Sequence, residues 1–164
     1  MFSWLPRDPP PVGQKAPAFT LLSGTGKKGR PSTFRGKNVV LLFYPANDTP
    51  IYHFCEFWDV GPDLRRLNTV VFGINPQTTE SHREFSSHSN FPFPLLVDDD
   101  QEVAALSNFD GGMVNRTVYL VGPDGLIRYA RRGMPRPEEV LAAAVHTRRA
   151  SRRKAARTRR VNTS

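Results

Sequence analysis

The most reactive side chain in this sequence is a single cysteine, Cys55. With one cysteine among 164 residues, the chain cannot form an internal disulfide or a Cys-x-x-Cys zinc or redox pair. Thiol chemistry at Cys55 therefore involves Cys55 alone or a second molecule. His53 lies two residues earlier, and an imidazole at that distance could assist the thiol as a nearby charge.

Other patterns that could bind a ligand are weak. No histidine has a metal-ligand spacing with Cys55 apart from His53. The acidic run at 98–100 follows an apolar strand and is typical of a solvated turn and helix cap. Residues 24–28 resemble a phosphate-binding loop but lack the G-x-x-x-x-G-K-[ST] spacing. We therefore expect no metal and no cofactor.

Short apolar runs rich in β-branched and aromatic residues predict the strands that must position these side chains. The runs are 39–44, 69–74, 95–97, 118–121 and 127–130. Several are apolar throughout, which indicates a central sheet covered on both faces. Residues 122–125 predict a hairpin turn between the last two strands. Residues 23–36, with four glycines and scattered basic residues, predict a surface loop that contributes nothing to the core.

Helical patterns fill the gaps between these strands. Residues 55–67 have apolar side chains at helical spacing, with a break or kink at Gly61-Pro62. Residues 79–87 and 101–107 predict two shorter helices. The last helix begins at Pro137, with acidic residues in its first turn and arginines toward its end, as the helix dipole favours. This order predicts an α/β fold with a mixed sheet flanked by helices, which is the order of the thioredoxin fold.

Four segments, in order, resemble peroxiredoxins of the alkyl hydroperoxide reductase and thiol-specific antioxidant family, especially its bacterioferritin-comigratory branch. They are 12–21 (VGQKAPAFTL), 34–45 (FRGKNVVLLFYP), 91–98 (FPFPLLVD) and 116–125 (RTVYLVGPDG). The resemblance covers residues 12–145. It implies the thioredoxin fold and a thiol-dependent peroxidase, which is an oxidoreductase that acts on hydrogen peroxide or small organic hydroperoxides.

The family's motif is a proline, three residues, a threonine, two residues and the reactive cysteine, with an arginine from a later strand. Pro45 and Thr49 match this motif, and Arg116 matches the distant arginine. The position of the reactive cysteine is occupied by Tyr52, whose phenol, with an ordinary pKa near 10, is a poor peroxide nucleophile. The only thiol, Cys55, lies three positions later, where some members have a resolving cysteine.

Two hypotheses for Cys55 follow from the resemblance. In the first, Cys55 is the nucleophile, Thr49 and Arg116 hold the peroxide, and Pro45 shapes the pocket. An external thiol would then reduce the sulfenic acid: thioredoxin, glutathione, another small thiol, or Cys55 of a second copy in a homodimer. In the second, Cys55 is a buried structural cysteine, and the domain is a catalytically impaired binding or scaffold protein.

The two residues missing between Thr49 and Cys55 leave the position of the thiol open. Deleting them inside a fixed helix would rotate Cys55 by about 160° from the family's face of that helix. Starting the helix later would instead bring Cys55 nearer to the helix N-terminus. The sequence does not decide between these alternatives.

Positive charge is concentrated at the end of the chain. From Thr147 onward there are eight basic residues and no acidic one, whereas the preceding 146 residues have 15 of each sign. This distribution predicts a basic tail at 147–164 after a domain at 12–146. The prolines at 6 and 9–11 predict a Pro-rich arm at 1–11. The tail is either disordered or an extension of the last helix, and it is suited to contact with nucleic acid or another acidic surface.

The sequence also carries no signal for a membrane. No apolar run approaches the roughly 18 residues that a membrane span requires, and residues 1–5 lack the pattern of a signal peptide. We therefore expect a cytoplasmic protein.

Overall fold

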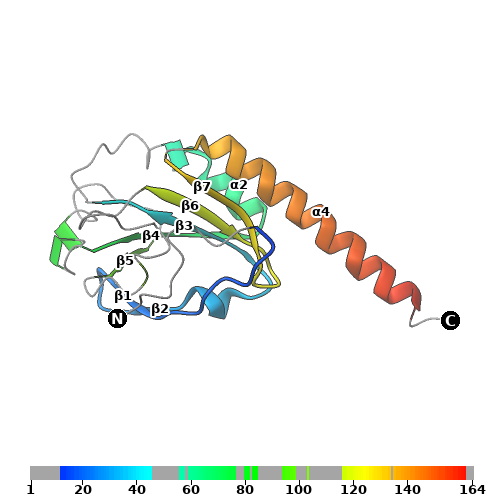
Figure 1. The fold of residues 1–164 in the computed structure, drawn as a ribbon, viewed down its shortest axis with the longest axis horizontal. Helices are drawn as coiled ribbons and strands as arrows, with labels where there is room; N and C mark the ends of the chain where they lie inside the picture. Colours follow the sequence, from blue (N-terminus) through cyan, green and yellow to red (C-terminus); the bar gives the residue numbers. More distant parts are fainter. Residues whose placement is uncertain are drawn as a thin grey trace.

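The computed structural model describes residues 12–45, 56–57, 59–76, 80–81, 83–84, 94–98, 103, 116–133 and 135–161. These residues form one mixed β-sheet with helices packed against it (Figure 1). In chain order the elements are β1 (Leu21–Ser23), β2 (Lys28–Gly29), η1 (Pro31–Phe34), β3 (Asn38–Phe43), α2 (Gly61–Arg66), β4 (Thr69–Asn75), β5 (Leu95–Val97), β6 (Thr117–Val121), β7 (Ile127–Arg132) and α4 (Pro137–Val161).

The sheet has the strand order β2-β1-β5-β4-β3-β6-β7, with β3 near its centre. Strand β3 pairs in parallel with β4 and antiparallel with β6, and β4 pairs in parallel with β5. The helical crossover that ends in α2 joins β3 to β4, as parallel neighbours require. This arrangement confirms the predicted α/β fold with a mixed sheet and the thioredoxin order of elements.

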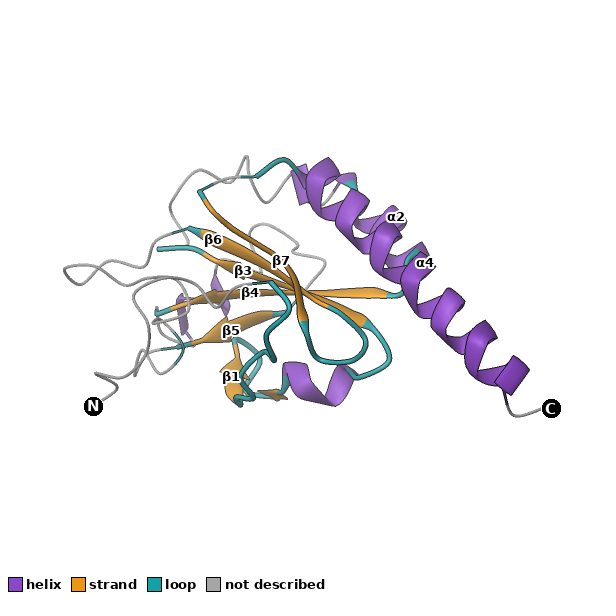
Figure 2. Ribbon diagram, turned by 45° about the vertical axis from the view of Figure 1, so that its right-hand side comes forward, coloured by secondary structure: helices purple, strands orange, loops and turns teal. Residues whose placement is uncertain are grey.

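Two apolar clusters cover the two faces of the sheet. Every residue of β3 is buried, because alternate side chains enter opposite clusters. Helices α2 and α4 lie side by side on one face (Figure 2) and contribute Leu64, Val140 and Ala144 to its cluster. The segment before β1 and the turn η1 cover part of the other face, where the Phe34 ring meets Phe72 edge-on at 5.5 Å between centroids.

The five predicted strands are all present; the run 95–97 coincides with β5, and the ends of the other four strands lie within two residues of the apolar runs. The predicted hairpin turn is also confirmed: the Gly125 N–H donates to the Gly122 carbonyl at 2.9 Å. Gly125 has a φ of 82°, a left-handed conformation that favours glycine at this position. Apolar runs therefore located the strands but not their exact ends.

The predicted break at Gly61-Pro62 is where α2 begins, with Pro62 in its first turn. Helical hydrogen bonding nevertheless reaches back to Glu56, whose carbonyl accepts from the Val60 N–H at 3.4 Å. The start of the predicted helix, at Cys55, lies outside the described residues. Most of 79–87 and 101–107 does too, although 80–81 and 83–84 are helical.

The expectation that residues 23–36 form a loop outside the core is wrong. Strands β1 and β2 form a short hairpin, and β1 pairs with β5, so β1 and β2 are the two outermost strands on that side of the sheet. Phe34 of η1 packs against the core. The glycines that suggested a loop are compatible with this packing, because Gly29 has no side chain to displace Leu96 beneath it. The arm at 1–11 lies outside the described residues.

Helix α4 starts at Pro137, as predicted, and continues to Val161. Its first turn is attached to β7 through Glu139, whose carboxylate accepts from the Tyr129 hydroxyl at 3.0 Å and from Arg131 Nη1 at 2.6 Å. Burial and the neighbouring Glu139 carboxylate raise the pKa of Tyr129. No helix in the described ranges is long and apolar enough to cross a membrane.

The contact beneath Gly29 leads to a prediction. A Cβ at this position would lie 2.4 Å from Leu96 Cδ2, and Leu96 is fully buried. We expect Gly29→Ala to lower the free energy of unfolding by about 1–3 kcal/mol, measured by urea denaturation, since the Leu96 side chain must leave its packed rotamer. Gly61→Ala is the matched control: it meets nothing within 4 Å and should be neutral or slightly stabilising. Equal effects of the two changes would contradict this account.

Candidate functional site

The ends of five neighbouring strands lie side by side along one edge of the sheet; this edge runs across the strand ends and not along an outer strand. Strands β5, β4 and β3 run in parallel, so their carboxyl ends meet there, followed by Asp98, Pro76 and Tyr44. Strand β6 runs the opposite way and begins at the same edge, where Thr117 pairs with Arg132 at the end of β7. In open α/β sheets the carboxyl ends of parallel strands are the usual place for a ligand.

Pro45 and Arg116 lie at this same edge, although they are far apart in the sequence. Phe43, the last residue of β3, is the pairing partner of Thr117, the first residue of β6. Pro45 follows that pair by two residues on one strand, and Arg116 precedes it by one residue on the other. Both Pro45 and Arg116 are partly buried. The Arg116 carbonyl accepts a hydrogen bond from the Gly133 N–H at 2.8 Å, which holds the start of β6 against the end of β7.

Two polar residues at this edge are buried, although the sequence did not indicate it: Asn75 was not singled out, and Asp98 was expected to be solvated. Asn75 and Asp98 are 1% and 3% exposed, and the Asn75 carbonyl accepts from the Asp98 N–H at 2.8 Å. The Asp98 carboxylate accepts the Val103 N–H at 3.3 and 3.2 Å from its two oxygens. Asp98 is therefore a cap for the following turn, as proposed for the acidic run, but it is buried and not solvated.

Buried tyrosines flank the edge on both faces of the sheet. Burial raises the pKa of Tyr44, whose backbone N–H donates to the Ile74 carbonyl at 3.1 Å. Burial also raises the pKa of Tyr119, although the nearby Arg132 acts in the opposite direction. The Tyr119 ring packs edge-on against Phe43, with 6.0 Å between ring centroids. Both phenols stay neutral at physiological pH, so the cationic groups at this edge are not paired with a phenolate.

Of the four predicted site residues, the structure describes Pro45 and Arg116, which follow β3 and precede β6 at the same edge of the sheet. Thr49 and Cys55 lie outside the described residues, as does Tyr52. Their positions in the chain fall within the connection from Pro45 to the helical residues Glu56 and Phe57. Phe57 is buried in the cluster beneath α2 and α4, so this connection is anchored at both ends.

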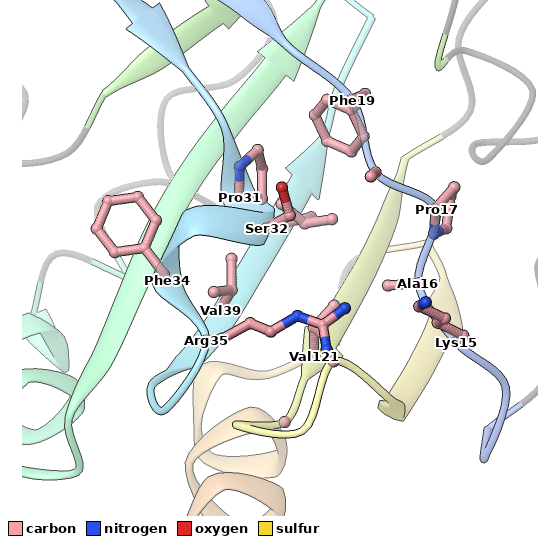
Figure 3. A pocket seen from close by; sticks show the side chains of 14 residues that line it. Lys15, Ala16, Pro17, Phe19, Pro31, Ser32, Phe34, Arg35, Val39 and Val121 are labelled. Atoms are coloured by element: carbon pink, nitrogen blue, oxygen red, sulfur yellow. The ribbon is translucent and has the colours of Figure 1, made fainter.

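A separate pocket of about 320 Å³ lies on the face opposite α4 (Figure 3). Phe19, Pro17 and Ala16 of the N-terminal segment line one side, and the Arg35 side chain lies across from them. The pocket is also lined by Val39, the second residue of β3, at the end of the strand remote from Pro45. This pocket is therefore distinct from the Pro45 and Arg116 edge.

Within the described ranges, no group of three or more histidine, cysteine or carboxylate side chains could hold a metal ion. The chemistry that the edge offers is instead that of hydrogen-bond donors. Arg116 has a guanidinium, a group that in proteins can bind negative charge on oxygen. The connection that follows Pro45 leads into a helix, and the first turn of a helix presents unpaired N–H groups.

Comparisons with known proteins agree with this architecture. A family model described as the AhpC/TSA family matches residues 12–130. A Bcp-type relative from Coxiella burnetii is 35% identical over 129 residues, covering 71% of this chain and 84% of the relative. Peroxiredoxin Bcp of Bacillus subtilis is 38% identical over 95 residues, covering 57% of this chain and 60% of that protein.

The crystal structure of peroxidoxin BcpB from Mycobacterium tuberculosis superposes with a TM-score of 0.72 and 26% identity, over 85% of this chain and 96% of that one. The fold and the sheet edge thus define a peroxiredoxin of the thioredoxin fold, a class of oxidoreductases. The chain belongs to the AhpC/TSA family, with Bcp and peroxiredoxin Q proteins among its relatives.

The Asp98 cap at this edge can be tested by substitution. Asp98→Ala leaves the buried Val103 N–H without the carboxylate acceptor, so we expect the free energy of unfolding to fall by about 1–3 kcal/mol in urea denaturation. Asp98→Asn keeps one acceptor oxygen and should lose less. If the two variants were equally stable, the hydrogen bonds to Val103 would not be the reason for burying Asp98.

Proposed function

We propose that this protein reduces hydrogen peroxide or small organic hydroperoxides, with Cys55 as the nucleophile. The observation that supports the proposal is the pairing of Phe43 with Thr117, because it brings the residues that follow β3 and precede β6, among them Pro45 and Arg116, to the same edge of the sheet. In a chain of the AhpC/TSA family, we expect the Arg116 guanidinium to bind a peroxide presented to the connection between Pro45 and Glu56. The reducing cytoplasm is the compartment in which a lone thiol stays available for this chemistry.

The proposed first step is an in-line attack of the Cys55 thiolate on one peroxide oxygen. An S–O bond forms, the O–O bond breaks, and the other oxygen leaves as hydroxide or alkoxide and takes a proton to become water or an alcohol. Arg116 and Thr49 hold the peroxide, and the guanidinium stabilises the charge that develops on the leaving oxygen. Pro45 shapes the pocket and limits access of solvent.

The proposed second step uses a thiol from outside the chain, because Cys55 has no second cysteine to pair with. The external thiol attacks the sulfenic sulfur, water leaves, and a mixed disulfide forms. Another thiol then attacks that disulfide and restores the Cys55 thiol. Thioredoxin, glutathione, another small thiol and Cys55 of a second copy in a homodimer are the sources to test, and intact-mass measurement separates them by the mass of the adduct.

The rival function is that of a binding or scaffold protein that has lost catalysis. Tyr52 occupies the position where the family resemblance places the nucleophile, and this substitution is what favours the rival. The two functions predict different behaviour of Cys55, so two measurements on the full chain decide between them.

The first measurement is peroxide consumption with dithiothreitol or thioredoxin as reductant. Cys55→Ser should lose all consumption above background, and Arg116→Ala should lower kcat/KM by about 10²–10³-fold, the usual effect of removing a donor to a developing oxyanion. Arg35→Ala is the matched control: it removes an exposed arginine from the remote pocket and should leave the rate unchanged. Background rates in both wild type and Cys55→Ser would support the rival instead.

The second measurement is the reactivity of the native thiol. Phe57 is buried and Asp59 is exposed; on a helix continued back from them, position 55 falls about 160° from Phe57 and about 40° from Asp59. We therefore expect Cys55 to react with iodoacetamide without unfolding. The half-maximal rate should occur below the pH of about 8.5 that is typical of a free thiol, and Arg116→Ala should raise this pH. A thiol that reacts only in urea would contradict the proposal.

A further inference from the structure

The C-terminal part of α4 extends beyond the sheet (Figure 1), and its first turns, from Arg148 to Ala155, lie by Asn68 and Pro123 of the body. Val140, Ala144 and Thr147 are buried against the body, whereas every residue from Arg149 to Val161 is exposed. At 1.5 Å per residue, the exposed part is a rod about 20 Å long. Stability of the domain therefore does not explain why the helix continues this far.

The exposed part of α4 is strongly cationic, and its arginines share one side. Counted at 100° per residue from the buried stripe of Val140, Ala144 and Thr147, six arginines fall within an arc of about 160° on the opposite side. We call these six the arginine face: Arg149, Arg152, Arg153, Arg157, Arg159 and Arg160. The buried stripe itself continues with small residues, Ser151, Ala155 and Thr158.

Most of this charge is not neutralised within the protein. Among the described residues, the side chains of Arg149, Arg152, Arg153, Lys154 and Arg157 have no ion pair or hydrogen bond. Arg148, nearer the body, donates to the Arg66 carbonyl of α2 at 3.1 Å. Like charges four residues apart, such as Arg149 and Arg153, destabilise a helix. A bound polyanion would remove this repulsion along the whole rod.

We propose that the arginine face of α4 binds duplex DNA through its phosphates, without sequence specificity. A helix about 10–12 Å wide fits a major groove about 12 Å wide, and a rod of about 20 Å spans about six base pairs. The exposed part has no aromatic residue on which the bases of a single strand could stack. It also lacks the large apolar face that a membrane-surface helix inserts into lipid.

The test is binding of the full chain to a fluorescent 20-base-pair duplex of arbitrary sequence, measured by anisotropy at several salt concentrations. Wild type should bind, with an affinity that falls linearly on a log–log plot as salt rises. The triple variant Arg149→Gln, Arg153→Gln and Arg157→Gln should bind at least about tenfold more weakly at low salt. Its salt slope should be smaller in magnitude by about 2.7, because each phosphate that an arginine neutralises adds about 0.9 to the slope.

The matched control neutralises three exposed cations on the body, by the changes Lys27→Gln, Lys28→Gln and Arg30→Gln. It lowers the net charge by the same amount and should bind like the wild type. Equal weakening in both variants would overturn the proposal, since net charge alone would then explain binding. Thermal unfolding monitored by circular dichroism should show neither variant to be less stable than the wild type, because none of the six side chains is buried.

Two other ligands complete the test. The chain should bind a single strand of the same length more weakly than the duplex, and vesicles of phosphatidylcholine with phosphatidylglycerol more weakly still. Preference for the single strand or for the vesicles would overturn the proposal in favour of that ligand. The readouts do not involve peroxide, so the result is independent of whether Cys55 is catalytic.

Discussion

The antiparallel register between β3 and β6 is the constraint on which the rest of the structure depends. It pairs Phe43 with Thr117 where β3 ends and β6 begins, and the side chains of β3 are divided between the two apolar clusters. A slip of one residue would exchange those two sets and shift Arg116 relative to the end of β3. The packing that fixes the core therefore also fixes where the backbone of Arg116 lies relative to Pro45.

The sequence predicted the central strands of the sheet better than the outer strands β1 and β2. Central strands such as β3 are apolar throughout because both faces are covered, and this pattern is visible without a structure. Strands β1 and β2 were missed because they are only three and two residues long and flank a turn with two glycines, and their order comes from contacts with β5 and its residue Leu96. Local patterns do not record such contacts, so the segment had the composition of a loop.

The site was predictable only in part, for a related reason. Pro45 and Arg116 were selected by resemblance to a family, because no periodicity links two residues on separate strands. Asn75 was missed and the burial of Asp98 was not expected, since a polar residue after an apolar run is typical of a loop. Only the strand order shows that these ends share one edge. The roles of Pro45, Thr49, Cys55 and Arg116 all stay predictions.

The placement of α4 separates the two activities proposed for the chain. The helix begins near the end of β7, at the edge where Arg116 lies. Its residues Arg148 to Ala155 lie by Asn68, which precedes β4, and Pro123, which follows β6, at the other end of these strands. About 16 Å of helix joins Pro137 to Arg148, whereas charges in physiological salt are screened over about 8 Å. The arginine face therefore adds little to the potential at Arg116. Duplex binding and thiol chemistry can each change without altering the electrostatics of the other.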